Sequence, residues 1–131
     1  METENSTTNE ILKALIVDDE VDICFLLSGI LRQKQLKPSF VNNLAGAKEA
    51  LEQEEPAILF LDNHLPDGFG LDFIKYVKAH FPLVKIVMIT AHDGLQERKT
   101  AQAEGADLFI SKPFTREVID YAIQKLLNPQ H

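Results

Sequence analysis

Short apolar runs alternate along the chain with longer segments in which apolar residues recur every three or four positions. The short runs have the length of β-strands, and the longer segments have the spacing of amphipathic helices. The predicted strands cover residues 14–17, 38–41, 57–61, 85–90 and 108–110. The predicted helices cover residues 20–35, 44–54, 71–80, 95–104 and 115–127, the last with Thr115 as its N-cap. A strand followed by a helix is thus repeated along the whole chain.

Most of these strands are apolar on both faces, which is typical of a parallel sheet with helices on both sides. We therefore predict an α/β fold, a flavodoxin-like doubly wound (βα)5 domain with the parallel strand order 2-1-3-4-5. Residues 63–70 contain one proline and two glycines, and are predicted to form a loop. In such a sheet, the loops at the carboxyl ends of the strands build the functional site.

The length and charge of the chain narrow the class of protein. It has 131 residues, the size of one domain, and a formal net charge of -7, which argues against a basic nucleic-acid-binding surface. A single cysteine excludes a disulfide framework. No apolar run approaches the roughly 20 residues that span a bilayer, and the first residues do not resemble a signal peptide, so a cytoplasmic location is expected.

We divide the chain into a flexible polar tail (1–11), one folded domain (12–128) and a short tail (129–131). No effector domain is expected in it. The chain is then either a stand-alone protein that acts by protein contact or a fragment of a longer protein.

Polar side chains stand where four of the predicted strands end. They are Asp18 and Asp19 after the first strand, Asp62 after the third, Thr90 at the end of the fourth and Lys112 after the fifth. In the predicted strand order these four strands are neighbours, so we expect the three carboxylates, the hydroxyl and the ammonium to converge.

Three carboxylates in one pocket repel one another, and one lysine does not neutralise them. A hard divalent cation held by few protein oxygens, as Mg²⁺ is, would supply the missing charge. Beside such a cation, Asp62 is equipped to attack a phosphoryl group and to keep it as an acyl phosphate. Lys112 would neutralise the phosphoryl oxygens and Thr90 would donate a hydrogen bond to one of them.

Four segments together carry a resemblance to a known family. Residues 15–20 (LIVDDE), 61–70 (LDNHLPDGFG), 89–91 (ITA) and 111–114 (SKPF) stand in order, each at the end of a predicted strand. This arrangement resembles the receiver domain of bacterial two-component response regulators, of the kind typified by the chemotaxis regulator. The resemblance covers about residues 12 to 128.

The resemblance implies roles for the residues of the site. The aspartate that matches Asp62 is phosphorylated in this family by a phospho-histidine on a sensor kinase. The positions of Asp18 and Asp19, the latter more directly, hold Mg²⁺ together with Asp62 and the backbone carbonyl at His64. The threonine and lysine that match Thr90 and Lys112 bind the phosphoryl oxygens.

The family also assigns roles around this centre. Ala91 fits a small residue at the entrance to the site, and Phe109 matches an aromatic switch that turns inward when the threonine moves. The peptide bond between Lys112 and Pro113 is expected to be cis. A lone phenylalanine is more often a core residue than a switch, so a place in the core is the alternative interpretation of Phe109.

Two histidines, His64 and His92, follow Asp62 and Thr90 by two positions each. In the family these positions border the phosphoryl group and influence how fast it is hydrolysed. We hypothesise that they tune the lifetime of the phosphoryl group. The alternative is that both are ordinary exposed loop residues.

The predicted function is therefore that of a phospho-accepting signalling domain, which catalyses only its own phosphorylation and slow dephosphorylation and is not otherwise an enzyme. Its expected partners are a sensor histidine kinase or a phosphotransfer protein, and an output protein or a second copy of the chain. The output contact would use the helix 95–104, the strand 108–110 and the helix 115–127. No direct nucleic-acid or membrane contact is expected.

The same residues allow four alternative interpretations. A hydrolase of the haloacid dehalogenase type needs a general-acid aspartate two residues after its nucleophile, where this chain has His64. A flavodoxin-like cofactor binder needs a loop rich in Gly, Ser or Thr after the first strand, where Asp18 and Asp19 stand. Asp18 and Asp19 also suit the capping of the helix 20–35, which is compatible with metal binding. A receiver fold that serves only as a partner surface is disfavoured by the complete site.

Overall fold

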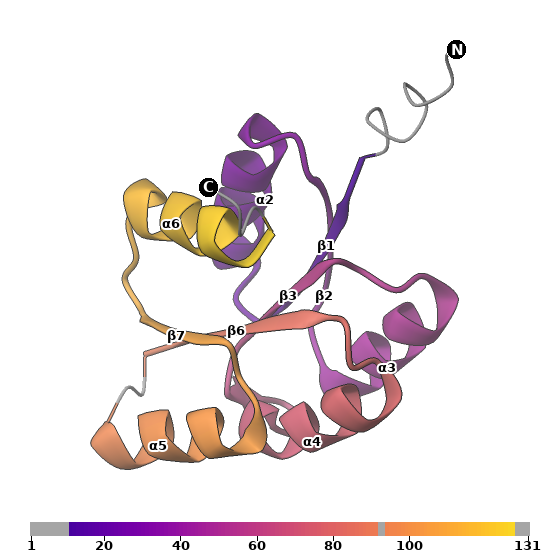
Figure 1. Cartoon of the computed structure of the whole chain (residues 1–131), viewed down its shortest axis with the longest axis vertical. Coiled ribbons are helices and arrows are strands. Elements are labelled where there is room, and N and C mark those ends of the chain that lie inside the picture. The colour runs from indigo at the N-terminus through magenta and orange to yellow at the C-terminus, as the bar shows by residue number, and fades with distance from the viewer. Residues whose placement is uncertain (1–10, 92–93, 128–131) are drawn as a thin grey trace.

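The computed structural model describes residues 11–91 and 94–127. Five parallel strands form one sheet in the order β2-β1-β3-β6-β7, and helices lie on both of its faces (Figure 1). The strands of this sheet are β1 (Lys13–Val17), β2 (Lys37–Val41), β3 (Ile58–Leu61), β6 (Lys85–Thr90) and β7 (Leu108–Ser111). The helices are α2 (Val21–Gln33), α3 (Leu44–Gln53), α4 (Gly70–His80), α5 (Leu95–Glu104) and α6 (Arg116–Leu127). The predicted fold class and strand order are confirmed.

Helices α2 and α6 cover one face of the sheet, and α3, α4 and α5 cover the other (Figure 1). Successive side chains of a strand point to opposite faces of the sheet, so a strand buried on both faces contributes side chains to two cores. On β1, Ala14 and Ile16 join the core under α2 and α6, while Leu15 and Val17 join the core under α3 and α4. This double burial explains why the inner strands β1, β3 and β6 are apolar at most positions, whereas the edge strand β2 carries exposed polar residues.

The start of α6 is as predicted. The Thr115 hydroxyl accepts a hydrogen bond from the Val118 backbone N–H at 3.2 Å, so Thr115 caps the helix. Just before this helix, the peptide bond between Lys112 and Pro113 is cis, which confirms that expectation.

The segment after β3 differs from the predicted loop. It contains a small antiparallel hairpin of β4 (His64–Leu65) and β5 (Gly68–Phe69), after which α4 begins at Gly70, one residue earlier than predicted. Gly70 lies against the backbone of Asp62, because a Cβ at this position would stand 2.3 Å from the Asp62 carbonyl oxygen. Two-residue strands leave no periodic pattern in a sequence, so the hairpin has no signal that pattern analysis detects.

The ends of the chain add little to these elements. The predicted tails, residues 1–11 and 129–131, lie outside the described residues except for Ile11. Among residues 11–91 and 94–127, no helix combines the length and the apolar character needed to cross a membrane.

Candidate functional site

The parallel strands deliver most of the predicted site residues to one pocket at their carboxyl ends. The pocket has a volume of about 340 Å³. It is lined by Asp19, Glu20, Asp62, His64, Thr90, Ala91 and Lys112. The sheet therefore brings together residues from four separate segments, as the strand order requires.

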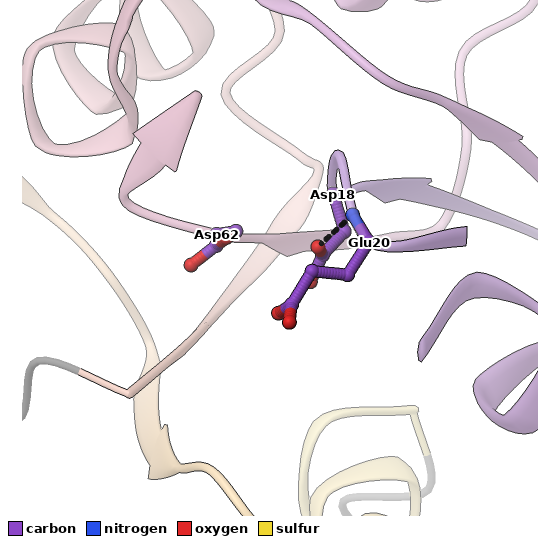
Figure 2. Close-up of side chains that lie close together, drawn as sticks. All are labelled: Asp18, Glu20 and Asp62. Carbon is purple, nitrogen blue, oxygen red and sulfur yellow. Dashed lines mark hydrogen bonds between the residues drawn. The ribbon is translucent and has the colours of Figure 1, made fainter. Parts of the chain in front are cut away.

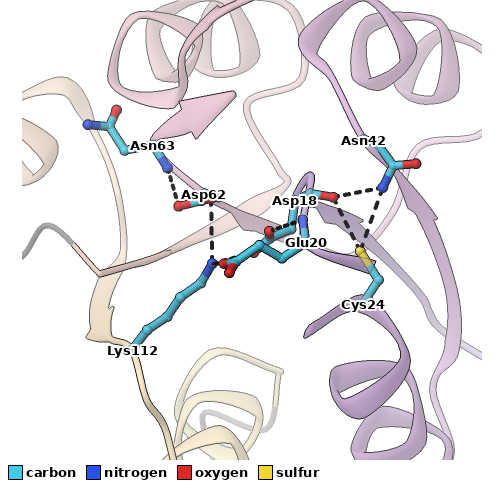
Figure 3. Close-up of polar contacts among 7 residues, drawn as sticks. All are labelled: Asp18, Glu20, Cys24, Asn42, Asp62, Asn63 and Lys112. Atoms are coloured by element: carbon cyan, nitrogen blue, oxygen red, sulfur yellow. Dashed lines mark hydrogen bonds and ion pairs between the residues drawn. The ribbon is translucent and has the colours of Figure 1, made fainter. Parts of the chain in front are cut away.

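Lys112 is the centre of this cluster. Its ammonium nitrogen Nζ lies 2.8 Å from Asp18 Oδ2, 2.5 Å from Glu20 Oε1 and 3.5 Å from Asp62 Oδ2 (Figure 3). The side chains of Lys112, Asp18 and Asp62 are all at least nine-tenths buried, whereas that of Glu20 is 60% exposed. One cation thus faces three carboxylates, two of them in a buried setting.

Glu20 was missed by sequence reasoning as a site residue. Carboxylate oxygens of Asp18, Glu20 and Asp62 lie within 4.8 Å of one another, close enough to share one metal ion (Figure 2). Asp19 is exposed and lines the same pocket, but is not part of this group among the described residues. Its role as the more direct metal ligand stays a prediction.

The cluster perturbs the acidity of its members. Burial raises the pKa of Asp18 above its usual value, although the hydrogen bond from Lys112 acts in the opposite direction. Burial alone would lower the pKa of Lys112, but its hydrogen bonds to Asp18 and Glu20 and the negative charges of Asp18 and Asp62 outweigh burial, and the pKa rises. Lys112 is therefore a permanent cation in this site at neutral pH.

Asp62 lines the pocket and is buried. It is 6% exposed, and its Oδ1 accepts a hydrogen bond from the Asn63 backbone N–H at 2.8 Å. Thr90, at the end of β6, is 1% exposed, and the following Ala91 is exposed at the pocket wall. The Asp62 carboxylate thus has a fixed orientation. The residue that follows Thr90 on the pocket wall, Ala91, has a small side chain.

The other predicted site residues are placed as follows. His64 is exposed on the pocket wall, and its ring packs edge-on against Phe69 at 5.4 Å between ring centroids. Phe109 is half-buried, with the guanidinium of Arg98 4.7 Å from its ring centroid. His92 lies outside the described residues. The tuning role of the two histidines and the switch role of Phe109 stay predictions.

The hairpin after Asp62 is tied to α3 by Asp67. The two carboxylate oxygens of Asp67 accept hydrogen bonds from the backbone N–H groups of Leu44 at 2.8 Å and Ala45 at 3.0 Å. These donors belong to the first turn of α3, where a negative charge is favourable. They lower the pKa of Asp67 below its usual value. Asp67 therefore anchors the hairpin that follows Asp62 to the first turn of α3.

Replacing Asp67 with asparagine is expected to lower the urea midpoint of unfolding at pH 7, because an amide has only one acceptor oxygen. A carboxyl group whose folded-state pKa is lowered stabilises the fold above its unfolded pKa, and this contribution is lost as the pH falls through the folded pKa. The deficit of Asp67→Asn should therefore persist down to about pH 4 and shrink below it. Urea titrations at several pH values, with the exposed Glu55→Gln as control, measure this. A deficit that does not change with pH would contradict it.

Comparison with known proteins decides the family. The sequence model of the response regulator receiver domain matches residues 14–124. This chain belongs to the response regulator receiver family. The recognition made from the four segments is confirmed, and the receiver domain is a component of two-component systems.

Individual relatives agree with this assignment. The receiver domain is 38% identical over 122 residues to the response regulator protein PilR of Pseudomonas aeruginosa, covering 90% of this chain and 27% of PilR. It is 31% identical over 105 residues to the phosphate regulon regulator PhoB of Escherichia coli, covering 79% of this chain and 46% of PhoB. The chain thus spans about a quarter to a half of the length of these relatives.

Solved structures share the fold. A receiver domain described as CheY-like, from Methanospirillum hungatei, superposes with a TM-score of 0.87 at 24% identity, covering 92% of this chain and 97% of the other. The NtrC4 receiver domain, described as a beryllofluoride-activated dimer, gives a TM-score of 0.85 at 29% identity, covering 91% and 98%. PhoB, of which the chain covers less than half, is described as a transcriptional regulatory protein. The expectation that this chain makes no direct nucleic-acid contact is therefore not confirmed.

Proposed function

We propose that this receiver domain accepts a phosphoryl group on Asp62 from a phospho-histidine and passes the signal to a partner through a changed surface. One observation carries the proposal: a buried, oriented Asp62 carboxylate faces the Lys112 ammonium at the carboxyl ends of the strands, beside two further carboxylates. Membership of the receiver family supports it.

The donor set of the pocket fits a Mg²⁺ ion. Asp18, Asp19 and Asp62, with the backbone carbonyl of His64, would hold the ion, and Glu20 adds a further carboxylate at the rim. Carboxylate oxygens together with retained waters are the ligands that Mg²⁺ prefers. When bound, Mg²⁺ supplies positive charge that offsets the carboxylates and polarises the phosphoryl oxygens.

The transfer is a displacement at phosphorus. A carboxylate oxygen of Asp62 forms a bond to phosphorus while the P–N bond to the donor imidazole breaks, and the electron pair leaves with the imidazole nitrogen. Lys112 neutralises charge on the phosphoryl oxygens, and the Thr90 hydroxyl donates a hydrogen bond to one of them. The product is an acyl phosphate on Asp62 and a free histidine on the donor.

The donor is a sensor histidine kinase or a phosphotransfer protein of the cytoplasm. The domain promotes only its own phosphorylation and slow dephosphorylation. Movement of Thr90 and Phe109 would then alter the face formed by α5, β7 and α6, which binds an output protein or a second copy of the chain. The description of the NtrC4 receiver as an activated dimer supports the second possibility.

We predict that incubation with acetyl phosphate and Mg²⁺ adds the mass of one phosphoryl group to the protein, measured by intact mass spectrometry. Asp62→Asn should give no stable adduct, because the amide has no nucleophilic carboxylate oxygen. Asp72→Asn, an acid in the first turn of α4 and away from the pocket, is the matched control and should be phosphorylated normally. An unchanged adduct on Asp62→Asn, or no adduct on the unmodified chain, would overturn the proposal.

A further inference from the structure

The backbone carbonyl of Asp18 accepts hydrogen bonds from two side chains that lie outside the pocket. Asn42 Nδ2 donates to it at 2.8 Å, and the Cys24 thiol donates to it at 3.3 Å (Figure 3). Asn42 is the first residue after β2, the strand at the edge of the sheet, and Cys24 lies in α2. Neither side chain lines the pocket, so both act on the site only through Asp18.

Asn42 continues the pairing of β1 with β2 beyond the end of the backbone ladder. The Asp18 N–H donates to the Val41 carbonyl at 3.2 Å, and the Asn42 side-chain amide donates to the carbonyl of the same Asp18. Both polar groups of the Asp18 backbone are thereby bonded to the edge strand at its carboxyl end, the N–H to its last residue and the carbonyl to the residue that follows it.

Holding this carbonyl fixes the direction of the next residue. The peptide bond is planar, so the orientation of the Asp18 carbonyl also sets where the Asp19 Cα stands. The carboxyl group of Asp18 itself accepts the Glu20 N–H at 2.8 Å, so the whole acidic turn 18–20 depends on the placement of one residue. Without these hydrogen bonds the turn would sample more conformations. Ordering it when a cation binds would then cost more conformational entropy.

Cys24 is the weaker of the two donors. It is fully buried, and burial together with the charge of Asp18 raises the pKa of its thiol to about 11. It therefore remains a protonated donor at neutral pH, but a thiol is a weak hydrogen-bond donor compared with an amide. The amide of Asn42 is therefore the stronger of the two donors to the Asp18 carbonyl.

We infer that Asn42 is a positioning residue for cation binding, which holds the Asp18–Asp19 peptide so that the acidic turn presents its carboxylates to Mg²⁺. The inference rests on the proposed function, because it assumes that the acidic turn binds this ion. It adds a determinant of ion affinity that lies outside the pocket, on the connection between the edge strand and α3.

A purely structural role of Asn42 is the alternative, and the neighbouring residue provides a matched control. Asn43 is the N-cap of α3, and its Oδ1 accepts the Gly46 N–H at 2.7 Å. Asn42 and Asn43 are both exposed, and each makes a hydrogen bond to the backbone, but only Asn42 contacts the acidic turn. Asn43→Ala thus removes a stabilising bond from the same segment without touching the site.

The experiment is a calorimetric titration of Mg²⁺ into the unmodified chain, Asn42→Ala, Asn43→Ala and Asn42→Gln. Loss of an outer-shell partner typically costs 10- to 100-fold in metal affinity, and we expect the low end, about tenfold, for Asn42→Ala. Asn43→Ala should keep the Mg²⁺ dissociation constant of the unmodified chain while losing stability to urea in EDTA. Asn42→Gln retains the amide donor and should recover part of the affinity.

The outcomes separate the inference from the function on which it rests. Unchanged Mg²⁺ affinity in Asn42→Ala, with normal affinity in the unmodified chain, overturns the inference and leaves the proposed function standing. An equal loss of affinity in Asn43→Ala also overturns it, because destabilisation of the segment would then explain the effect. An unmodified chain that binds no Mg²⁺ overturns both. If Asn42→Ala does not fold in EDTA, Asn42→Gln decides: full loss of affinity in this folded variant contradicts the inference, and partial loss supports it.

Discussion

Replacing Lys112 with methionine is expected to lower the free energy of unfolding in EDTA at pH 7 by about 3 kcal/mol, the low end of the cost of breaking a buried ion pair. Asp18 and Asp62 are 3% and 6% exposed, and Lys112 is the cation that contacts both in the described part of the chain. Methionine keeps much of the volume of the side chain but leaves two buried carboxylates facing each other. Their repulsion, and not a cavity, then causes the loss.

The pH dependence gives this prediction a signature. Burial already raises the pKa of Asp18, and removal of the ammonium should raise it further. A carboxyl group with a raised folded-state pKa binds a proton more readily in the folded protein, so the free energy of unfolding falls as the pH rises through that pKa. The deficit of Lys112→Met should therefore be largest at neutral pH and narrow towards pH 4.

Urea denaturation at several pH values measures the effect, with the exposed Lys99→Met as a control for the loss of one positive charge. Saturating Mg²⁺ should restore part of the lost stability to Lys112→Met, since a divalent cation would replace the missing charge. A deficit that is the same at every pH and unaffected by Mg²⁺ would show that Lys112 contributes by packing alone.

Removal of divalent cations is expected to lower the initial rate of phosphorylation by acetyl phosphate by about a hundredfold, the size typical of losing one electrostatic contact at a transition state. The reason is the charge of the pocket, in which one ammonium faces three carboxylates. The same pocket must also admit an anionic phosphoryl group. Without further positive charge, the site repels its own substrate.

The rate is followed by intact mass spectrometry in Mg²⁺ and in EDTA at equal ionic strength. Matching the ionic strength separates a bound cation from general screening, which acts over about 10 Å at 0.1 M salt. Sodium chloride added to the EDTA sample should not restore the rate. Equal rates with and without Mg²⁺ would exclude the cation from the transfer.

The sheet and the centre of the site were predictable from the sequence, because each depends on a local pattern. Continuous apolar runs predict strands buried on both faces, and the residue that follows each run is delivered to the same edge. Asp62 and Lys112 were found in this way, although they lie 50 positions apart in the sequence. The cap at Thr115 was likewise predictable from the few residues around it.

What the sequence did not predict depends on side chains that reach across loops. Glu20 looks like an ordinary residue of a first helical turn, and its contact with Lys112 joins residues 92 positions apart. Asn42 and Asp67 stand in polar connections where such residues are common, and their partners, Asp18 and the first turn of α3, lie more than 20 positions away. No periodicity records such contacts, because they depend on how the loops meet after the sheet has formed.

The central claim is that Asp62 itself carries the phosphoryl group, and chemical localisation tests it most directly. Borohydride reduces an acyl phosphate of aspartate to homoserine, so the phosphorylated protein should be reduced, digested and sequenced by mass spectrometry. We predict homoserine at position 62 and at no other acidic position after treatment with acetyl phosphate and Mg²⁺, and much less of it when EDTA replaces Mg²⁺. Homoserine at position 18 or 19 instead, or an adduct that survives reduction unchanged, would contradict the claim.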